Sequence, residues 1–225
     1  MNSRSISFIR RAELSKAAFE VVAQFGLRGT TLERVGDIAG VSKGVVLHHF
    51  KDKSSLLEAV FRRSNSLLSE AVKELYRYAH NPHERLWAII FANFYETIFN
   101  HKVCQAWLAL AAEVPHNKQC QRIQTVCHAR IHTNLKHELR VLCGGNDAEK
   151  IAKQLGVIID GIWVRAGLQC EPMPSQQAID EVEFALYRLL IEVKDQKASH
   201  KSARTKIGHI ANILMNSKAF KEKAL

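Results

Sequence analysis

The sequence predicts an all-α protein, with a small N-terminal domain of three helices and a larger C-terminal helical bundle. Apolar residues recur at three- and four-residue steps along most of the 225 residues, whereas the alternating pattern of β-strands is scarce. An apolar share of 47% is enough to bury a core, and no apolar run is long enough to cross a membrane.

The first two predicted helices lie close to the N-terminus. Residues 14–25 place apolar side chains on one face, and Gly26 then offers a left-handed stop. Thr30 and Glu33 have the spacing of a capping box, which predicts a short helix that ends at Gly40.

The next helices follow from their caps. Ser42 can cap a short helix that runs to about Phe50, and Asp52 can cap a long one that ends before Asn81-Pro82. The remaining periodic segments predict five further helices, at residues 83–98, 106–114, 123–139, 149–169 and 177–194.

The net charge of +10 is concentrated at the two ends of the chain. Residues 1–66 carry +5, residues 67–192 carry −1 and residues 193–225 carry +6. Basic segments attract polyanions, because neutralised phosphates release counterions. Residues 195–225 are therefore predicted to be a mobile basic tail that contacts DNA phosphates. The alternative is that an apolar set docks onto the bundle: Ile207, Ile210, Ile213 and Leu214.

Other classes of protein find little support. The N-terminus lacks the apolar core of a signal peptide, and five cysteines without a C-x-x-C pair indicate a reduced cytoplasm. His128 and His132 have a spacing that can chelate a metal, but no third ligand is fixed, so surface histidines are the better interpretation. Because catalytic motifs are absent from the sequence, we expect no enzyme, cofactor or metal.

Residues 30–50 predict a DNA-reading unit. Two short helices joined by a glycine-containing turn suit a major groove, since the first holds the second against the DNA backbone. Gly44 would allow close approach at the start of the second helix. That helix is too short to bury all of its side chains, so four are expected in the groove: Lys43, Val45, Leu47 and His48.

The segment TTLERVGDIAGVSKGVVLHHFKDKSSLLEAV resembles the helix-turn-helix domain of the tetracycline-repressor (TetR) family, and the resemblance covers residues 8–68. It implies that residues 31–50 read DNA and that Lys53 contacts a phosphate. The candidate DNA contacts are Thr30, Thr31, Ser42, Lys43, Gly44, Val45, Leu47, His48, His49, Phe50 and Lys53.

Three positions depart from the family pattern. The family commonly has Tyr where this chain has Leu47 and His49, and Thr where it has Val45. These differences remove hydroxyl groups that usually hold phosphates, although His49 can still donate one such hydrogen bond.

The neutral central region holds aromatic side chains suited to a quaternary ammonium ion: Phe91, Phe94, Tyr95, Phe99, Trp107 and Trp163. Cation–π attraction in an aromatic cage contributes roughly 0.5–2 kcal/mol per contact. Asp160, Glu96 or Glu113 could supply the counter-charge. The alternative is that the rings are core and that Asp160 belongs to a structural pair or cap at a dimer seam.

Segments of this region also resemble the choline-sensing, BetI-like repressors of glycine-betaine synthesis: NFYET (93–97), QAWLALAAE (105–113) and IDGIWVRAGL (159–168). The resemblance implies choline as the effector and betaine-synthesis genes as the target. We expect residues 69–194 to form an effector-binding and dimerisation domain. Its candidate ligand-binding residues are Phe91, Phe94, Tyr95, Trp107, Glu113, Asp160 and Trp163.

The predicted helices 149–169 and 177–194 carry apolar stripes wide enough for a four-helix interface with a second copy. A two-fold homodimer would place its reading helices about one DNA turn apart, roughly 34–36 Å, on a near-palindromic operator. Two rivals remain open. One is a regulator of the same fold, repressor or activator, that controls other genes and binds a different small ligand. The other is an all-α carrier of small amines or lipids, which leaves the capped segment 30–50 unexplained.

Overall fold

The computed structural model describes residues 3–192 and 194–224, and the regular elements in these ranges are all helices. The chain divides into two units. The first contains the residues up to 66 together with 102–124, and the second contains 67–101 and the residues from 125 onward.

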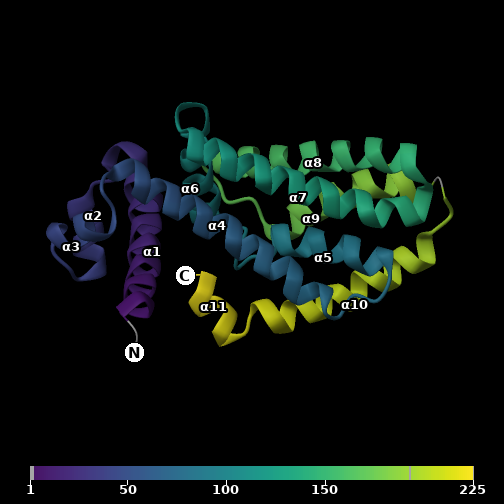
Figure 1. Cartoon of the computed structure of the whole chain (residues 1–225). Helices are drawn as coiled ribbons and strands as arrows, with labels where there is room; N and C mark the ends of the chain where they lie inside the picture. Colours follow the sequence, from purple (N-terminus) through teal and green to yellow (C-terminus); the bar gives the residue numbers. More distant parts are fainter. Residues whose placement is uncertain (1–2, 193, 225) are drawn as a thin grey trace. The chain divides into compact units, whose positions relative to one another are not determined.

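The helices follow one another along the chain with the labels of Figure 1. Up to residue 116 they are α1 (Ser3–Gly29), α2 (Leu32–Ala39), α3 (Lys43–His49), α4 (Lys53–Tyr76), α5 (Pro82–Phe94), α6 (His101–Ala111) and the 3₁₀ turn η1 (Val114–His116). They continue with α7 (Lys118–Cys143), α8 (Gly145–Leu168), α9 (Ser175–Leu186), the π-helical turn η2 (Tyr187–Ile191), α10 (Lys197–Met215) and α11 (Lys218–Ala224).

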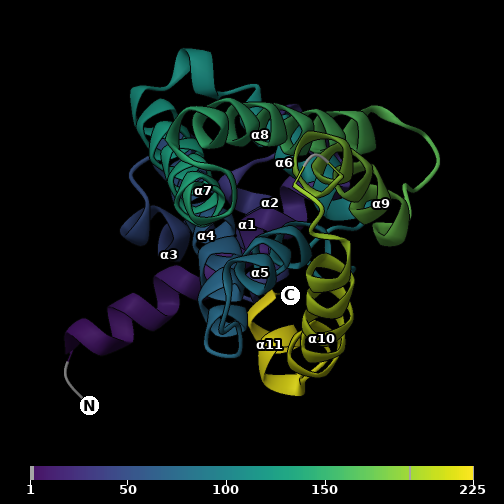
Figure 2. The same cartoon turned by 90° about the vertical axis from the view of Figure 1, so that its right-hand side faces the viewer.

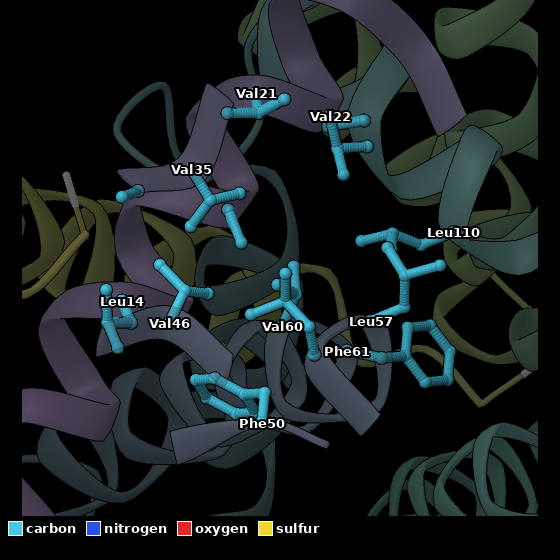
Figure 3. Close-up of a cluster of buried hydrophobic side chains, with 14 of the residues drawn as sticks. Leu14, Val21, Val22, Val35, Val46, Phe50, Leu57, Val60, Phe61 and Leu110 are labelled. Carbon is cyan, nitrogen blue, oxygen red and sulfur yellow. The ribbon is translucent and has the colours of Figure 1, made fainter. Parts of the chain in front are cut away.

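The core of the first unit is built where α1, α2, α3 and the start of α4 meet (Figure 3). Its side chains are apolar and almost wholly buried, and include Leu14, Val21, Val35, Val46, Phe50, Leu57, Val60 and Phe61. Ala106 and Leu110 of α6 and Cys120 of α7 complete this core. The first unit therefore contains residues 102–124, which the sequence analysis did not assign to it.

The helix ends of the first unit follow from capping chemistry. Thr31, rather than Thr30, is the N-cap of α2, and its hydroxyl accepts a hydrogen bond from the Arg34 amide at 3.2 Å. Helical geometry in α1 is interrupted at Gly26, whose φ is 64°. Ser42 caps α3, as predicted, and accepts a hydrogen bond from the Val45 amide at 3.4 Å.

In the second unit, α5 is buried along its length. It packs against α9 and α10, and α9 packs in turn against α8 (Figure 2). The sequence predicts a helix to Ile98, but α5 ends at Phe94, because Tyr95 adopts an extended conformation and begins a turn over residues 95–100. This turn is central to the candidate effector site. Val193, the last member of the predicted 177–194 stripe, lies outside the described residues.

The prediction of a mobile C-terminal tail is wrong for the described part of that segment. Residues 197–215 form α10, which lies alongside α5 (Figure 1). Its buried face repeats at three- and four-residue steps and consists of His200, Ala203, Ile207, Ala211 and Met215. The alternative prediction of docking holds for Ile207, whereas Ile213 is exposed. The basic residues mask this stripe in the sequence, because they lie on the same helix.

Candidate nucleic-acid interface and effector site

The turn between α2 and α3 has a tightly constrained geometry. The Val41 amide donates to the Gly36 carbonyl at 2.9 Å, and a Cβ atom at Gly36 would lie only 2.6 Å from the Val41 carbonyl oxygen. Gly40 has a φ of 66°, the left-handed conformation that glycine adopts at least cost. These two glycines hold α3 across the end of α2.

α3 directs one side chain inward and most of the others outward. Val46 packs in the core of the first unit. The exposed members are Lys43, Gly44, Val45, Leu47 and His48. The structure therefore presents together the four side chains that the sequence assigned to the groove. Ammonium and imidazole groups can donate to base edges or phosphates, and Val and Leu can contact a thymine methyl group.

Gly44 is not required by the fold. A Cβ atom at this position would meet only the Ser42 Oγ, at 3.6 Å, which is an ordinary van der Waals distance. Glycine within a helix costs roughly 0.5–1 kcal/mol relative to alanine. Nothing inside the first unit therefore requires a glycine at this position. Because Gly44 has no side chain, another molecule can approach the backbone of α3 closely.

The C-terminal end of α3 is surrounded by basic groups. The rings of His48 and His49 lie 5.1 Å apart in an edge-to-face arrangement. Arg11 of α1 donates to the His49 carbonyl, and its guanidinium group stands 4.3 Å from the centre of the Phe50 ring. Burial lowers the pKa of His49, and the nearby charges of His48, Arg11 and Arg10 lower it further. Arg11 was missed by the sequence analysis, since only the tertiary fold brings it to α3.

The N-terminus of α4 lies in the same unit. The Asp52 carboxylate accepts a hydrogen bond from the Ser55 amide at 2.7 Å, as expected of a cap, and this bond lowers the pKa of Asp52. The Lys53 ammonium donates to the Leu27 carbonyl of α1. Lys53 therefore links α1 to α4, and it retains further donors for a phosphate, because an ammonium group has three.

Two predicted DNA contacts are wrong. Thr30 is 1% exposed and donates its hydroxyl hydrogen bond to the Gly26 carbonyl at 2.8 Å, so it stabilises the end of α1. Phe50 is also 1% exposed and packs in the core of the first unit. The Thr30 hydroxyl is occupied by its bond to α1 and the Phe50 ring fills the core, so neither side chain can reach a groove.

The second unit contains a row of three aromatic rings. The ring of Phe94, at the end of α5, lies 5.2 Å from that of Phe99, and Phe99 lies 5.1 Å from Trp163 of α8. Both contacts are edge-to-face, the favourable geometry for aromatic pairs. This row, Phe94–Phe99–Trp163, unites two of the predicted ligand-binding residues.

The structure places the other predicted ligand-binding aromatics elsewhere. Phe91 packs against Trp87, with ring centres 5.4 Å apart, and against α10 at Gly208, where a Cβ atom would come within 3.0 Å of the ring. Tyr95 forms hydrogen bonds with α10 through its hydroxyl group. Trp107, on α6, and Glu113, which follows that helix, both belong to the first unit.

Asp160 is held by a partner on α7. Its Oδ2 lies 3.4 Å from the Nε2 of His128, and burial raises the pKa of Asp160 while His128 opposes the rise. Asp160 thus has a structural partner within one chain, whereas its predicted place at a dimer seam stays a prediction. Asp160 also stands about one helical turn before Trp163 on α8.

The histidines of α7 face carboxylates of α8. His132 lies 3.3 Å from Glu149, which also bonds Lys136 at 2.7 Å and Lys153 at 3.2 Å. The two lysines lower the pKa of Glu149 to about 2. Among the described residues, His, Cys, Asp and Glu side chains form no group of three that could hold a metal ion. His128 is exposed and His132 half-buried, as expected of surface histidines, and both also lie close to carboxylates of α8.

Exposed apolar side chains gather on α8 and α9. Val157 is 72% exposed and Phe184 63%, and Val164 and Leu168 continue the same face of α8. Leu186, which the sequence assigned to a dimer stripe, is only 1% exposed and packs within its own unit. In the described ranges, no helix is long and apolar enough to span a membrane.

Comparisons with known proteins agree with this architecture. The sequence profile of the tetR family of bacterial regulatory proteins matches residues 14–60, and that of the C-terminal domain of BetI-type transcriptional repressors matches residues 82–191. The HTH-type transcriptional regulator BetI of Serratia proteamaculans is 37% identical over 184 residues, which cover 79% of this chain and 93% of that protein. BetI of Pseudomonas paraeruginosa is 34% identical over 174 residues, which cover 76% and 88%.

A solved structure has the same fold. It is a transcriptional regulator from Saccharomonospora viridis, in complex with choline. The two structures align with a TM-score of 0.71 at 16% identity, over 80% of this chain and 97% of the other.

Proposed function

The chain belongs to the tetR family of bacterial regulatory proteins and carries a BetI-type C-terminal domain, and we propose that it is a homodimeric repressor of glycine-betaine synthesis genes that choline releases from DNA. The family and the curated relatives are transcriptional regulators, so the chain is a DNA-binding regulator and not an enzyme. Its operator contacts, dimer and effector are our proposal.

The observation that carries DNA reading is the exposed face of α3. A helix of seven residues buries only Val46, while Lys43 and His48 stand exposed on either side of it. Gly44 leaves the backbone open between them. A short exposed helix braced by a preceding one suits a major groove, where side chains contact base edges.

The DNA-reading proposal is tested with fragments selected by the protein from genomic DNA. Lys43→Ala and His48→Ala should each weaken binding to the selected fragment by about 1–3 kcal/mol, because a good base contact contributes that much. Lys150→Ala, an exposed lysine of α8, is the matched control and should change little. Equal affinity of all three variants would remove α3 as the reading helix.

The effector proposal rests on the row Phe94–Phe99–Trp163 together with Asp160. An aromatic ring and a carboxylate one turn apart on α8 can serve the same cation, since rings attract quaternary ammonium ions and a carboxylate supplies the counter-charge. The relatives are named BetI, and the Saccharomonospora viridis neighbour was solved with choline. These names support choline for this chain.

Choline binding is tested by the intrinsic tryptophan fluorescence and by release of the selected fragment. Choline should change the fluorescence of the wild type and release the fragment, whereas an equal concentration of sodium chloride should do neither. Trp163→Leu should still bind the fragment but resist release. A wild type that ignores millimolar choline would rule out this effector and leave DNA reading intact.

The dimer proposal rests on the apolar face of α8 and α9. Val157, Val164 and Leu168 repeat at helical spacing, and Phe184 adds an aromatic ring from α9. Gly161 lies between Val157 and Val164 and has nothing within 4 Å of a Cβ position, so a second helix can approach closely there. A two-fold interface uses the same surface on both copies, so one exposed apolar face can supply both of its sides.

A further inference from the structure

The C-terminal helix α10 lies beyond the BetI-type profile, which ends at residue 191, yet it is firmly anchored in the second unit. Arg204 pairs with Asp180 at 3.0 Å, and Lys206 pairs with Glu84 at 2.7 Å. Gly208 accommodates the ring of Phe91 at close contact. The first half of α10 is thus fixed to α9 and α5.

The second half of α10 and its C-cap residue, Asn216, are bonded to the turn that follows α5. The Tyr95 hydroxyl donates to the Asn212 Oδ1 at 2.8 Å and accepts from the Asn216 Nδ2 at 2.7 Å. Asn216 also donates to Asn212 at 2.9 Å, so the three polar groups satisfy one another. The Thr97 hydroxyl donates to the Met215 carbonyl at 3.1 Å.

The same turn positions Phe99. The amides of Ile98 and Phe99 both donate to the Tyr95 carbonyl, at 2.8 Å and 2.7 Å. Phe99 is the middle ring of the row that ends at Trp163. Hydrogen bonds that hold the Tyr95 side chain therefore also restrain the Tyr95 carbonyl, and the position of Phe99 depends on that carbonyl.

We infer that α10 is a strap that positions the effector site: Asn212 and Asn216 hold Tyr95, and through it they hold the ring of Phe99 against Trp163. Both asparagines are argued to act through Tyr95, so both are positioning residues. The inference rests on the proposed effector site for its functional part. Its structural part, the order of the turn, can be measured without any effector.

The first measurement is hydrogen exchange of the Ile98 and Phe99 amides in the full-length protein without ligand. The double variant Asn212→Ala/Asn216→Ala should exchange about tenfold faster, because both hydrogen bonds of the Tyr95 hydroxyl are lost. Tyr95→Phe should reproduce the effect from the other side. Lys206→Met is the matched control: it removes a polar link between α10 and α5 away from the turn and should leave both amides unchanged.

The second measurement is the Kd of choline from tryptophan fluorescence in the same variants. It should rise about tenfold in the double variant and in Tyr95→Phe, and by less than about twofold in Lys206→Met. Asn212→Asp keeps the acceptor oxygen for the Tyr95 hydroxyl and should restore tight binding to within about twofold.

The outcomes separate the two proposals. Unchanged exchange at Ile98 and Phe99 in both disrupting variants would overturn the strap, whatever choline does. Faster exchange with an unchanged choline Kd would also overturn it, because the turn would then not position the site. If the variants exchange faster but choline has no effect on the wild type, the strap is supported and only the choice of choline as effector is ruled out.

Discussion

At the scale of single residues, Gly44 in the N-terminal turn of α3 is a glycine that the fold itself does not require. Gly44 has room for a side chain, since only the Ser42 Oγ lies within 4 Å of a Cβ position. Gly44→Ala should therefore stabilise the first unit by roughly 0.5–1 kcal/mol. The same methyl group should weaken operator binding if DNA comes close to the backbone there. Thermal unfolding and fragment affinity, measured on one preparation, test the expected gain in stability and the expected loss of DNA affinity. A variant that binds the fragment as well as the wild type would contradict the close approach of DNA.

His200 makes the docking of α10 depend on pH. Burial and, to a smaller extent, the neighbouring charge of Arg204 together lower the pKa of His200 to about 4. The unfolded chain takes up this proton at about pH 6.5, so the folded state binds fewer protons between these values and loses stability as the pH falls from about 6.5 to 4. The pKa of His83, whose ring centre is 6.5 Å away, is also lowered by burial and acts in the same direction. Glu183 accepts from His200 at 3.3 Å.

The measurement is the melting temperature of wild type and His200→Gln across this pH range. The amide keeps a donor for Glu183 but cannot take up the proton, so the variant should lose less stability on acidification. His209→Gln, at an exposed position of α10, should follow the wild type. Parallel curves for all three proteins would contradict the role of His200.

Residue roles were predictable from sequence where local spacing decides them. The exposure of Lys43 and His48 follows from the length of α3, and the Ser42 cap follows from its residue type. The inward turn of Thr30 was not predictable, because Thr31 competes for the same cap. The contact of Arg11 with the end of α3 depends on tertiary packing, and no spacing in the sequence indicates it.

At the scale of elements, α10 shows where periodicity is hidden. Its buried stripe contains His200, two alanines and Met215, and four Lys and Arg residues share the helix, so charge dominates the sequence pattern. The helix predicted to reach Ile98 ends at Phe94, because Tyr95 adopts an extended conformation and its hydroxyl bonds to α10. Most other helices were predicted with boundaries within several residues, because their apolar stripes are continuous, but α1 begins at Ser3, well before the predicted start at Leu14.

Deletion of residues 197–225 tests the structural role of α10. The truncation would expose Trp87 and Phe91, which α10 covers with His200 and Gly208. Loss of this buried apolar surface should lower the melting temperature by more than about 5 °C. The slope of DNA affinity against salt should change little, because this helix is docked and is not a free arm. An unchanged melting temperature with a flatter salt slope would instead support the mobile basic tail.

At the scale of the whole molecule, assembly depends on the exposed face of α8 and α9. Val157→Asp or Phe184→Asp should give a folded monomer with poor operator affinity, since a charge would be buried in the interface and a half-site alone binds weakly. Leu186→Asp is expected to unfold its own unit instead, because Leu186 is core. Val141→Asp, at an exposed apolar site of α7, is the control. Sedimentation velocity at micromolar concentration checks the result, and a monomeric wild type would contradict the two-fold arrangement.

The central claim, that this chain is a sequence-specific DNA-binding regulator, is tested most directly by one ratio. Fluorescence anisotropy at physiological salt gives the Kd of the wild type for the selected genomic fragment and for a scrambled duplex of the same composition. The account predicts that the selected fragment binds at least about 10³-fold more tightly, because base contacts by α3 add to the phosphate contacts that both duplexes share. A ratio near one would contradict it.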